Sequence, residues 1–199
     1  MTASAEKKLA GYNVLLCLTG GIACYKVADL ASKLTQAGVN VSVAMTESAE
    51  QFIKPVTFAA VTGNPVFKTL WQKGEDYRTR HISLTDRADL IVIAPATANI
   101  IAKVAHGIAD DLVSTLALAS FESCDMLIAP AMNSRMFNAP ATQENIEKVK
   151  KWGVKTIGPA SGNLACGTSG VGRMSEAAEI LQEISKLLLK KPAKNLSAN

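Results

Sequence analysis

The stretch from Asn13 to Met45, NVLLCLTGGIACYKVADLASKLTQAGVNVSVAM, decides the fold. Its first six residues are mostly apolar and favour a buried strand, and the small residues at 19–21 follow as a turn. An apolar pattern with helical spacing covers residues 22–37, and Gly38 stands where a helix commonly ends. Residues 39–45 favour a second strand. The stretch therefore predicts a strand–helix–strand unit.

The rest of the chain repeats this alternation. Apolar runs at 88–94, 125–129 and 154–157 predict three more strands. Helical patterns lie between the runs and continue to about residue 119, over 142–152 and over 175–189. Near-continuous apolar strands that alternate with helices are typical of a parallel sheet covered by helices on both faces. The sequence therefore predicts the α/β class.

The chain length suits one domain. Its 199 residues allow one sizeable core, and we expect a single domain over 13–190 with an N-terminal extension over 1–12. The polar residues 191–199 predict a flexible tail. No apolar run reaches the about 18 residues of a membrane span, and the polar start lacks a secretory signal. We therefore expect a cytoplasmic protein that does not enter a membrane.

Charge and cysteine usage narrow the classes of ligand. The net charge is +4, and the lysines gather at the chain ends without interleaved aromatic residues, which argues against nucleic-acid binding. Small phosphorylated or carboxylated ligands fit this modest surplus of positive charge better than nucleic acid does. The four cysteines lack metal-ligand spacing, so we predict no metal site and reduced thiols. Cys17, Cys24 and Cys124 are interpreted as packing residues, although a helix dipole at Cys24 would lower its pKa.

The fourth cysteine, Cys166, lies in a glycine-rich segment, SGNLACGTSGVGRM, at 161–174. Four glycines cost backbone entropy and bury little, so the segment is poorly suited to a core. We interpret it as a mobile flap that presents Cys166 to a ligand. An ordinary surface loop with a bystander thiol is the alternative.

Several motifs follow predicted strands directly, at the end of a parallel sheet where ligands bind. The turn at 19–21 is suited to one phosphate group, or it is only a tight turn. The segments 95–99 and 130–133 add polar groups, which are either ligand contacts or helix caps and turns. His81 is suited to proton transfer, or it is a surface residue in a basic loop. His106 is interpreted as a packing residue or a helix end.

Five motifs occur in order and carry a resemblance to a known family. They are TGGIA at 19–23, RHISL at 80–84, APATAN at 94–99, PAMNxxM at 130–136 and ACGxxGxGRM at 165–174. In this combination the chain resembles the homo-oligomeric flavin-containing cysteine decarboxylases over about residues 13–174. The resemblance implies a Rossmann-like (flavodoxin-like) fold and FMN as cofactor.

The resemblance also implies roles for individual residues. The FMN phosphate would face Gly20, Gly21 and Ile22, and the rest of FMN would contact Thr46, Thr97, Ala98, Asn99 and Ala131. His81 would act as the base and Asn133 would hold the substrate carboxylate, with Met136 beside it. Cys166 would supply a proton from a substrate clamp that includes Ala165, Gly167, Arg173 and Met174.

The reaction implied by the resemblance is FMN-dependent decarboxylation of phosphopantothenoylcysteine to 4'-phosphopantetheine in coenzyme A biosynthesis. The implied partners are further copies of the chain, in a trimer or a dodecamer, and a separate CTP-dependent ligase, unless the chain is the decarboxylase half of a fusion. Three alternatives stay open: an oxidative peptidyl-cysteine decarboxylase of the lantibiotic type, a flavin prenyltransferase and a non-catalytic FMN-binding regulatory subunit. The thiol of Cys166 argues against the first alternative, and the combination of His81, Asn133 and the Cys166 clamp argues against the second. The short basic termini argue against the third.

Overall fold

A six-stranded parallel sheet forms the centre of the computed structural model, which describes residues 9–70, 80–163, 167 and 169–194. The strand order is β3-β2-β1-β4-β5-β6. The strands are β1 (Asn13–Leu18), β2 (Asn40–Met45), β3 (Val66–Phe67), β4 (Leu90–Ala96), β5 (Asp125–Pro130) and β6 (Lys155–Thr156). Every residue of β1 and β4 is buried, which explains why the central strands are almost wholly apolar.

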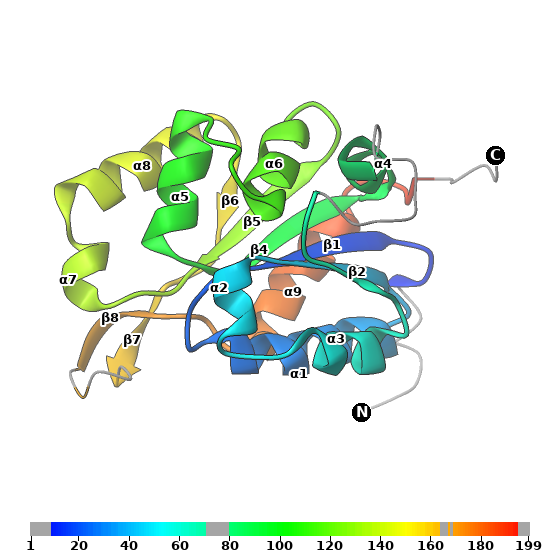
Figure 1. Ribbon diagram of the computed structural model, residues 1–199, viewed down its shortest axis with the longest axis horizontal. Helices are drawn as coiled ribbons and strands as arrows, with labels where there is room; N and C mark the ends of the chain where they lie inside the picture. The colour runs from blue at the N-terminus through cyan, green and yellow to red at the C-terminus, as the bar shows by residue number, and fades with distance from the viewer. Residues whose placement is uncertain (1–8, 71–79, 164–166, 168, 195–199) are drawn as a thin grey trace.

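Helices cover both faces of the sheet (Figure 1). One face carries α1 (Cys24–Gln36), α3 (Pro55–Thr62) and α9 (Ala177–Leu188). The other face carries α4 (Arg80–Arg87), α5 (Ala98–His106), α6 (Leu112–Ala119) and α8 (Pro140–Lys151). Because side chains alternate along a strand, Leu16 of β1 packs in the first layer and Leu15 packs in the second. The predicted α/β class and its doubly covered parallel sheet are confirmed.

The first strand–helix–strand unit has the predicted order. The register pairs Val14 of β1 with Val41 of β2 on one side and with Leu90 of β4 on the other. Gly38 follows α1 with a φ of 85°, a backbone conformation that residues with a side chain rarely adopt. A Cβ at this position would lie 3.2 Å from the Ala10 Cα. The structure therefore gives a physical reason for glycine at the end of the predicted helix.

The glycine-rich segment is only partly a loop. Two short antiparallel strands, β7 (Ala160–Asn163) and β8 (Ser169–Arg173), flank its tip and form a hairpin. The interpretation of the whole segment as a loop is therefore wrong for these flanks. Glycines weaken the pattern by which a strand is recognised, yet here they allow extended backbone with positive φ, 140° at Gly172. The short helix α7 (Ser134–Phe137) packs beside β8.

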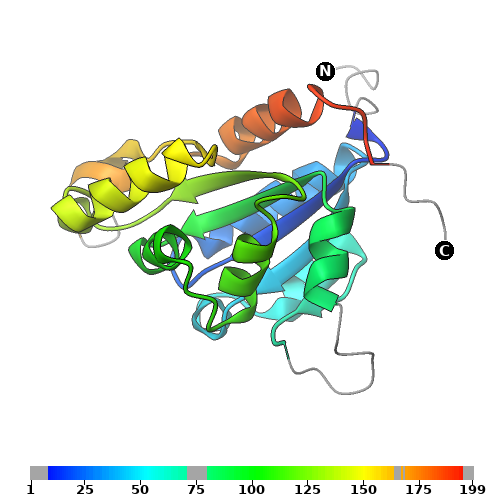
Figure 2. The ribbon, with the colours of Figure 1, turned by 90° about the horizontal axis from the view of Figure 1, so that it is seen from above.

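Residues 191–194 were expected to belong to a flexible tail, and the structure places them against the domain. The Lys194 backbone N–H donates to Asp89 Oδ1 at 2.7 Å, and the Lys194 ammonium donates to the Ser123 carbonyl at 2.8 Å. Tyr12 Oη donates to the Lys191 carbonyl at 2.7 Å. These contacts lie where β1, β4 and β5 begin, at the end of the sheet away from the hairpin (Figure 2). Within the described ranges, no helix has the length and apolarity needed to cross a bilayer.

Candidate active site

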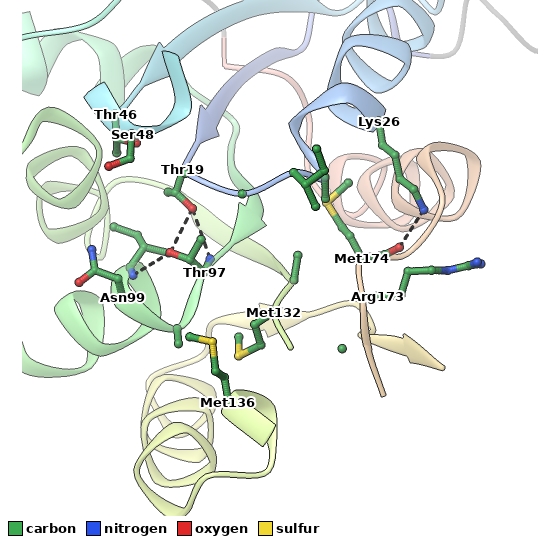
Figure 3. A pocket seen from close by; sticks show the side chains of 18 of the residues that line it. Thr19, Lys26, Thr46, Ser48, Thr97, Asn99, Met132, Met136, Arg173 and Met174 are labelled. Carbon is green, nitrogen blue, oxygen red and sulfur yellow. Dashed lines mark hydrogen bonds between the residues drawn. The ribbon is translucent and has the colours of Figure 1, made fainter. Parts of the chain in front are cut away.

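A pocket of about 1260 Å³ opens where β1, β2, β4 and β5 end (Figure 3). It lies between the turn after β1 and the start of α5, the point where the strand order reverses direction. Open parallel sheets bind their ligands at this point. The pocket is lined by twelve of the residues expected in the site, namely Gly20, Gly21, Ile22, Thr46, Thr97, Ala98, Asn99, Ala131, Asn133, Met136, Arg173 and Met174.

Two threonines join the ends of β1 and β4. Thr19 is 3% exposed, and its Oγ1 donates to the Pro95 carbonyl at 2.6 Å and accepts from the Thr97 N–H at 3.3 Å. Thr97 Oγ1 in turn accepts from the Ile100 N–H at 3.3 Å and caps α5 (Figure 3). The cap interpretation and the pocket position therefore both hold for Thr97, and the positive end of the α5 dipole is held at the pocket.

Gly20 lies against the start of α2 (Glu47–Glu50). A Cβ on Gly20 would collide with the Ser48 Cβ, whereas a Cβ on Gly21 would lie 3.6 Å from Pro95 Cγ in ordinary contact. Thr46 holds α2 in this place, because its Oγ1 accepts from the Ala49 N–H at 3.2 Å. The turn before α1 is thus packed under α2, with backbone amides at a helix N-terminus that suit an anion.

Asn133 lies after β5 and is the N-cap residue of α7. Its Oδ1 accepts from the Arg135 N–H at 2.8 Å, so the side chain caps the helix and lines the pocket. Met132 and Met136 lie beside it as flexible apolar walls, and Met136 is 51% exposed (Figure 3). The loop is tied to β4 because the Ala131 N–H donates to the Ala96 carbonyl at 3.0 Å.

The hairpin and α1 form another wall of the pocket. The Met132 N–H donates to the Gly172 carbonyl at 2.9 Å. This bond joins β8 to residues 131–133, the Asn133 loop. The Lys26 ammonium donates to the Met174 carbonyl at 3.4 Å and lies 2.8 Å from Glu176 Oε1 (Figure 3). Arg173 lies 3.0 Å from the same oxygen. This wall is therefore held together by two cations that share one carboxylate.

The shared carboxylate predicts a dependence of stability on pH. The hydrogen bond from Lys26 holds the pKa of Glu176 below its usual 4.5. The folded state therefore binds fewer protons than the unfolded state, and the ion pair contributes stability above pH 4.5 that is lost as pH falls through the lowered pKa. We expect Glu176→Gln to lose less of its free energy of unfolding than the parent protein does as the pH is lowered. Urea titrations from pH 7 to about 3 measure this free energy. The same pH dependence in the variant and the parent would contradict the assignment.

The sequence did not point to several polar residues that line the pocket, among them Lys26, Ser48 and Lys103. Burial alone would lower the pKa of Lys103, but hydrogen bonds to Asp110 and Asp111 outweigh burial and raise the pKa. Its Nζ lies 2.6 Å from Asp111 Oδ2, so the cation is neutralised within the wall. Of these three, only Lys26 had a usable signal in the sequence, since it lies four residues after Ile22 in the helix that was predicted to begin there. The other two depend on contacts between distant segments.

Some predicted residues cannot be placed in the pocket. Ala165 and Cys166 lie outside the described residues, and so does the side chain of His81, whose backbone lies in the first turn of α4. Gly167 is exposed and is not among the lining residues. His106 ends α5, as one interpretation expected, with its Nε2 3.0 Å from Asn145 Oδ1.

The other three cysteines have the properties of packing residues. Cys17 and Cys24 are buried, and burial raises the pKa of both thiols. Cys24 Sγ donates to the Thr19 carbonyl at 3.2 Å. Burial likewise raises the pKa of the half-buried Cys124. At Cys24 burial outweighs the lowering effect that its position at a helix start suggested.

The sheet topology, the glycine turn under α2 and the capped helix where the strand order reverses together define an α/β protein with a candidate ligand site at the carboxyl ends of its strands. Residues 2–189 match the Flavoprotein family, and the chain belongs to this family. It is 43% identical over 175 residues to "Probable phosphopantothenoylcysteine decarboxylase" of Streptococcus mutans, which covers 88% of the chain and 98% of that protein. The resemblance inferred from the five motifs is therefore confirmed.

Solved structures agree in fold. A cysteine-to-serine mutant of PPC decarboxylase complexed with pantothenoylaminoethenethiol aligns with a TM-score of 0.79 at 29% identity, over 90% of this chain and 99% of the other. The FMN-dependent cysteine decarboxylase SpaF aligns with a TM-score of 0.77 at 31% identity, over 92% and 98%. The chain spans 42% of the bifunctional coenzyme A biosynthesis protein CoaBC of Bacillus subtilis, with 47% identity.

Proposed function

We propose that the protein binds FMN and decarboxylates phosphopantothenoylcysteine to 4'-phosphopantetheine, a step of coenzyme A biosynthesis. The observation that carries the proposal is the convergence of the glycine turn, the Thr19–Thr97 pair, the Asn133 loop and the β8 hairpin on one pocket. The relative from Streptococcus mutans, matched over almost its whole length, supports the same activity.

The pocket fits a flavin mononucleotide in size and chemistry. Its volume of about 1260 Å³ leaves room for cofactor and substrate together. The turn at Gly20 and Gly21 offers one phosphate site, while Thr97 and Asn99 offer hydrogen bonds to the polar edge of a ring system. Ala98 and Ala131 add small apolar side chains to the lining. These features support FMN rather than a dinucleotide, which needs a second phosphate site.

Different residues of the chain would take part in different steps of the reaction. When bound, FMN supplies an acceptor for two electrons from the substrate thiol and a source of the same two electrons afterwards, so no net oxidation occurs. The Asn133 amide would hold the departing carboxylate, with Met132 and Met136 excluding water. His81 would move the proton of the reacting substrate, and Cys166 would return a proton to the enethiolate left after carbon dioxide departs.

Exposed apolar side chains at the rim of the pocket support an oligomer. Ile22 is 57% exposed and Tyr25 is 64% exposed, and both line the pocket opening. A second copy of the chain would cover these side chains, in line with the expected trimer or dodecamer. Light scattering on the purified protein measures the number of copies. The cytoplasmic location and a separate CTP-dependent ligase belong to the same proposal.

The decisive experiment is the analysis of cofactor and product. The purified protein is expected to carry flavin absorbance, and mass spectrometry identifies what phosphopantothenoylcysteine becomes. A saturated thiol product supports the proposal. An enethiol that is never reduced, formed from a peptide with C-terminal cysteine, supports the peptidyl-cysteine alternative. Bound FMN without release of carbon dioxide from either substrate supports a regulatory subunit.

A change at Cys166 separates the two halves of the proposed reaction. We expect Cys166→Ser to retain flavin and release carbon dioxide but to accumulate the enethiol, because the hydroxyl is a far weaker acid than the thiol and returns the proton poorly. Cys124→Ser is the matched control and should give the normal product. Formation of 4'-phosphopantetheine at the normal rate by Cys166→Ser would remove this thiol from the mechanism.

A further inference from the structure

The hairpin rests on the Asn133 loop through backbone contacts that leave no room for side chains. At Gly172 a Cβ would collide with the Met132 carbonyl oxygen, and it would lie 3.4 Å from the Ser134 backbone nitrogen. The hydrogen bond from the Met132 N–H to the Gly172 carbonyl, 2.9 Å long, joins the same two segments. The two backbones therefore lie in direct contact at Gly172. We call this contact of β8 with the Asn133 loop and Ser134 the seam.

The second contact of this seam involves a side chain. A Cβ on Gly170 would collide with Ser134 Oγ and would lie 3.3 Å from the Ser134 Cβ. Ser134 Oγ is buried, and within the described part of the chain no hydrogen-bond partner satisfies it. A buried hydroxyl without a partner costs stability, so hydrogen bonding does not account for its presence here. Its observed contact is steric, against the backbone of β8.

We propose that Ser134 and Gly170 are positioning residues that set how closely the β7–β8 hairpin approaches the Asn133 loop. Arg173 and Met174 follow the seam directly and line the pocket, as Asn133 does on the other side. The spacing between these groups is therefore fixed by the fit of one hydroxyl against one glycine. Substrate binding and turnover depend on this spacing, a consequence that rests on the proposed decarboxylase function.

The pair permits a test by compensation. Gly170→Ala pushes the hairpin away from α7, and we expect it to lower kcat/KM by about 10- to 100-fold, mainly through KM, with flavin content unchanged. Ser134→Ala removes the opposing hydroxyl but keeps the Met132–Gly172 hydrogen bond that joins the two backbones, so alone it should lower kcat/KM by no more than about threefold, less than Gly170→Ala does, and leave Tm unchanged or raised. In the double variant the methyl group introduced on β8 occupies the space that the hydroxyl vacates, and kcat/KM should recover to within about threefold of the parent.

Hydrogen exchange supplies a readout that does not depend on activity. The Met132 amide is protected by its bond to the Gly172 carbonyl, so its exchange should accelerate about tenfold in Gly170→Ala and slow again in the double variant. Recovery of both quantities supports the seam, since general destabilisation by alanine in β8 would not be relieved by a change in α7. Parent-like Gly170→Ala, or a double variant no better than the single one, overturns the proposal.

A second variant and the exchange data cover the two cases in which the kinetic test gives no result. If Gly170→Ala does not fold, Ser134→Val fills the same space from the α7 side and should produce the same loss of Met132 protection. If the parent protein releases no carbon dioxide, the proposed function fails, while the exchange data still decide whether Ser134 and Gly170 set the position of the hairpin.

Discussion

Asn133→Asp is expected to lower kcat/KM for decarboxylation by about 100-fold or more, with the fold and the flavin retained. The substitution separates the two roles of this side chain. The remaining Oδ1 still accepts from the Arg135 N–H and caps α7, whereas the amide donors are replaced by a charged oxygen. A carboxylate of the substrate would then meet a like charge where it needs a donor. Steady-state kinetics with flavin absorbance and Tm measure each part.

A remote asparagine provides the control for this change of charge. Asn145 lies on α8 and pairs with His106, outside the residues that line the pocket. Asn145→Asp should therefore keep kcat/KM within about twofold, as surface changes usually do. Normal turnover by Asn133→Asp would show that the Asn133 amide does not hold the carboxylate.

Gly20→Ala is expected to release the flavin. The new methyl group overlaps the Ser48 Cβ, so either α2 or the turn before α1 must move. Overpacking of this kind costs about 1–3 kcal/mol of stability. A displaced turn no longer presents its amides to the phosphate, and we expect flavin affinity to fall about tenfold or more, equivalent to about 1.4 kcal/mol. Thermal unfolding and titration of the apoprotein with FMN measure the two effects.

The neighbouring glycine provides the matched control for stability. A methyl group on Gly21 meets Pro95 Cγ at an ordinary 3.6 Å, so Gly21→Ala should keep the free energy of unfolding within about 0.5 kcal/mol. If Gly20→Ala is as stable as Gly21→Ala and binds FMN normally, the packing of the turn under α2 has no bearing on the cofactor.

Local patterns were sufficient to predict the frame of the fold. The apolar run of β1, the turn after it and the helical spacing of α1 each follow from neighbouring residues, and Gly38 marks the helix end. Parallel strands place their carboxyl ends at one edge of the sheet. For this reason residues as far apart as Gly20 and Asn133 could be expected together in one pocket before the structure was known.

Contacts between distant segments could not be predicted in this way. The two-residue strand β3 is too short to have a pattern of its own, and glycines obscure the alternation of β8. The fit of Gly20 under Ser48 and of Gly170 against Ser134 depends on tertiary packing, which sequence spacing does not encode. The same holds for the ion pair between Lys103 and Asp111.

The docking of Lys194 beside Asp89 has a practical consequence for handling the protein. The strands between this contact and the pocket are about six residues long, which corresponds to roughly 20 Å. An affinity tag or a biosensor linker attached after Lys194 would start at the far edge of the molecule. Protein immobilised in this way should have the support at the edge of the sheet opposite the pocket.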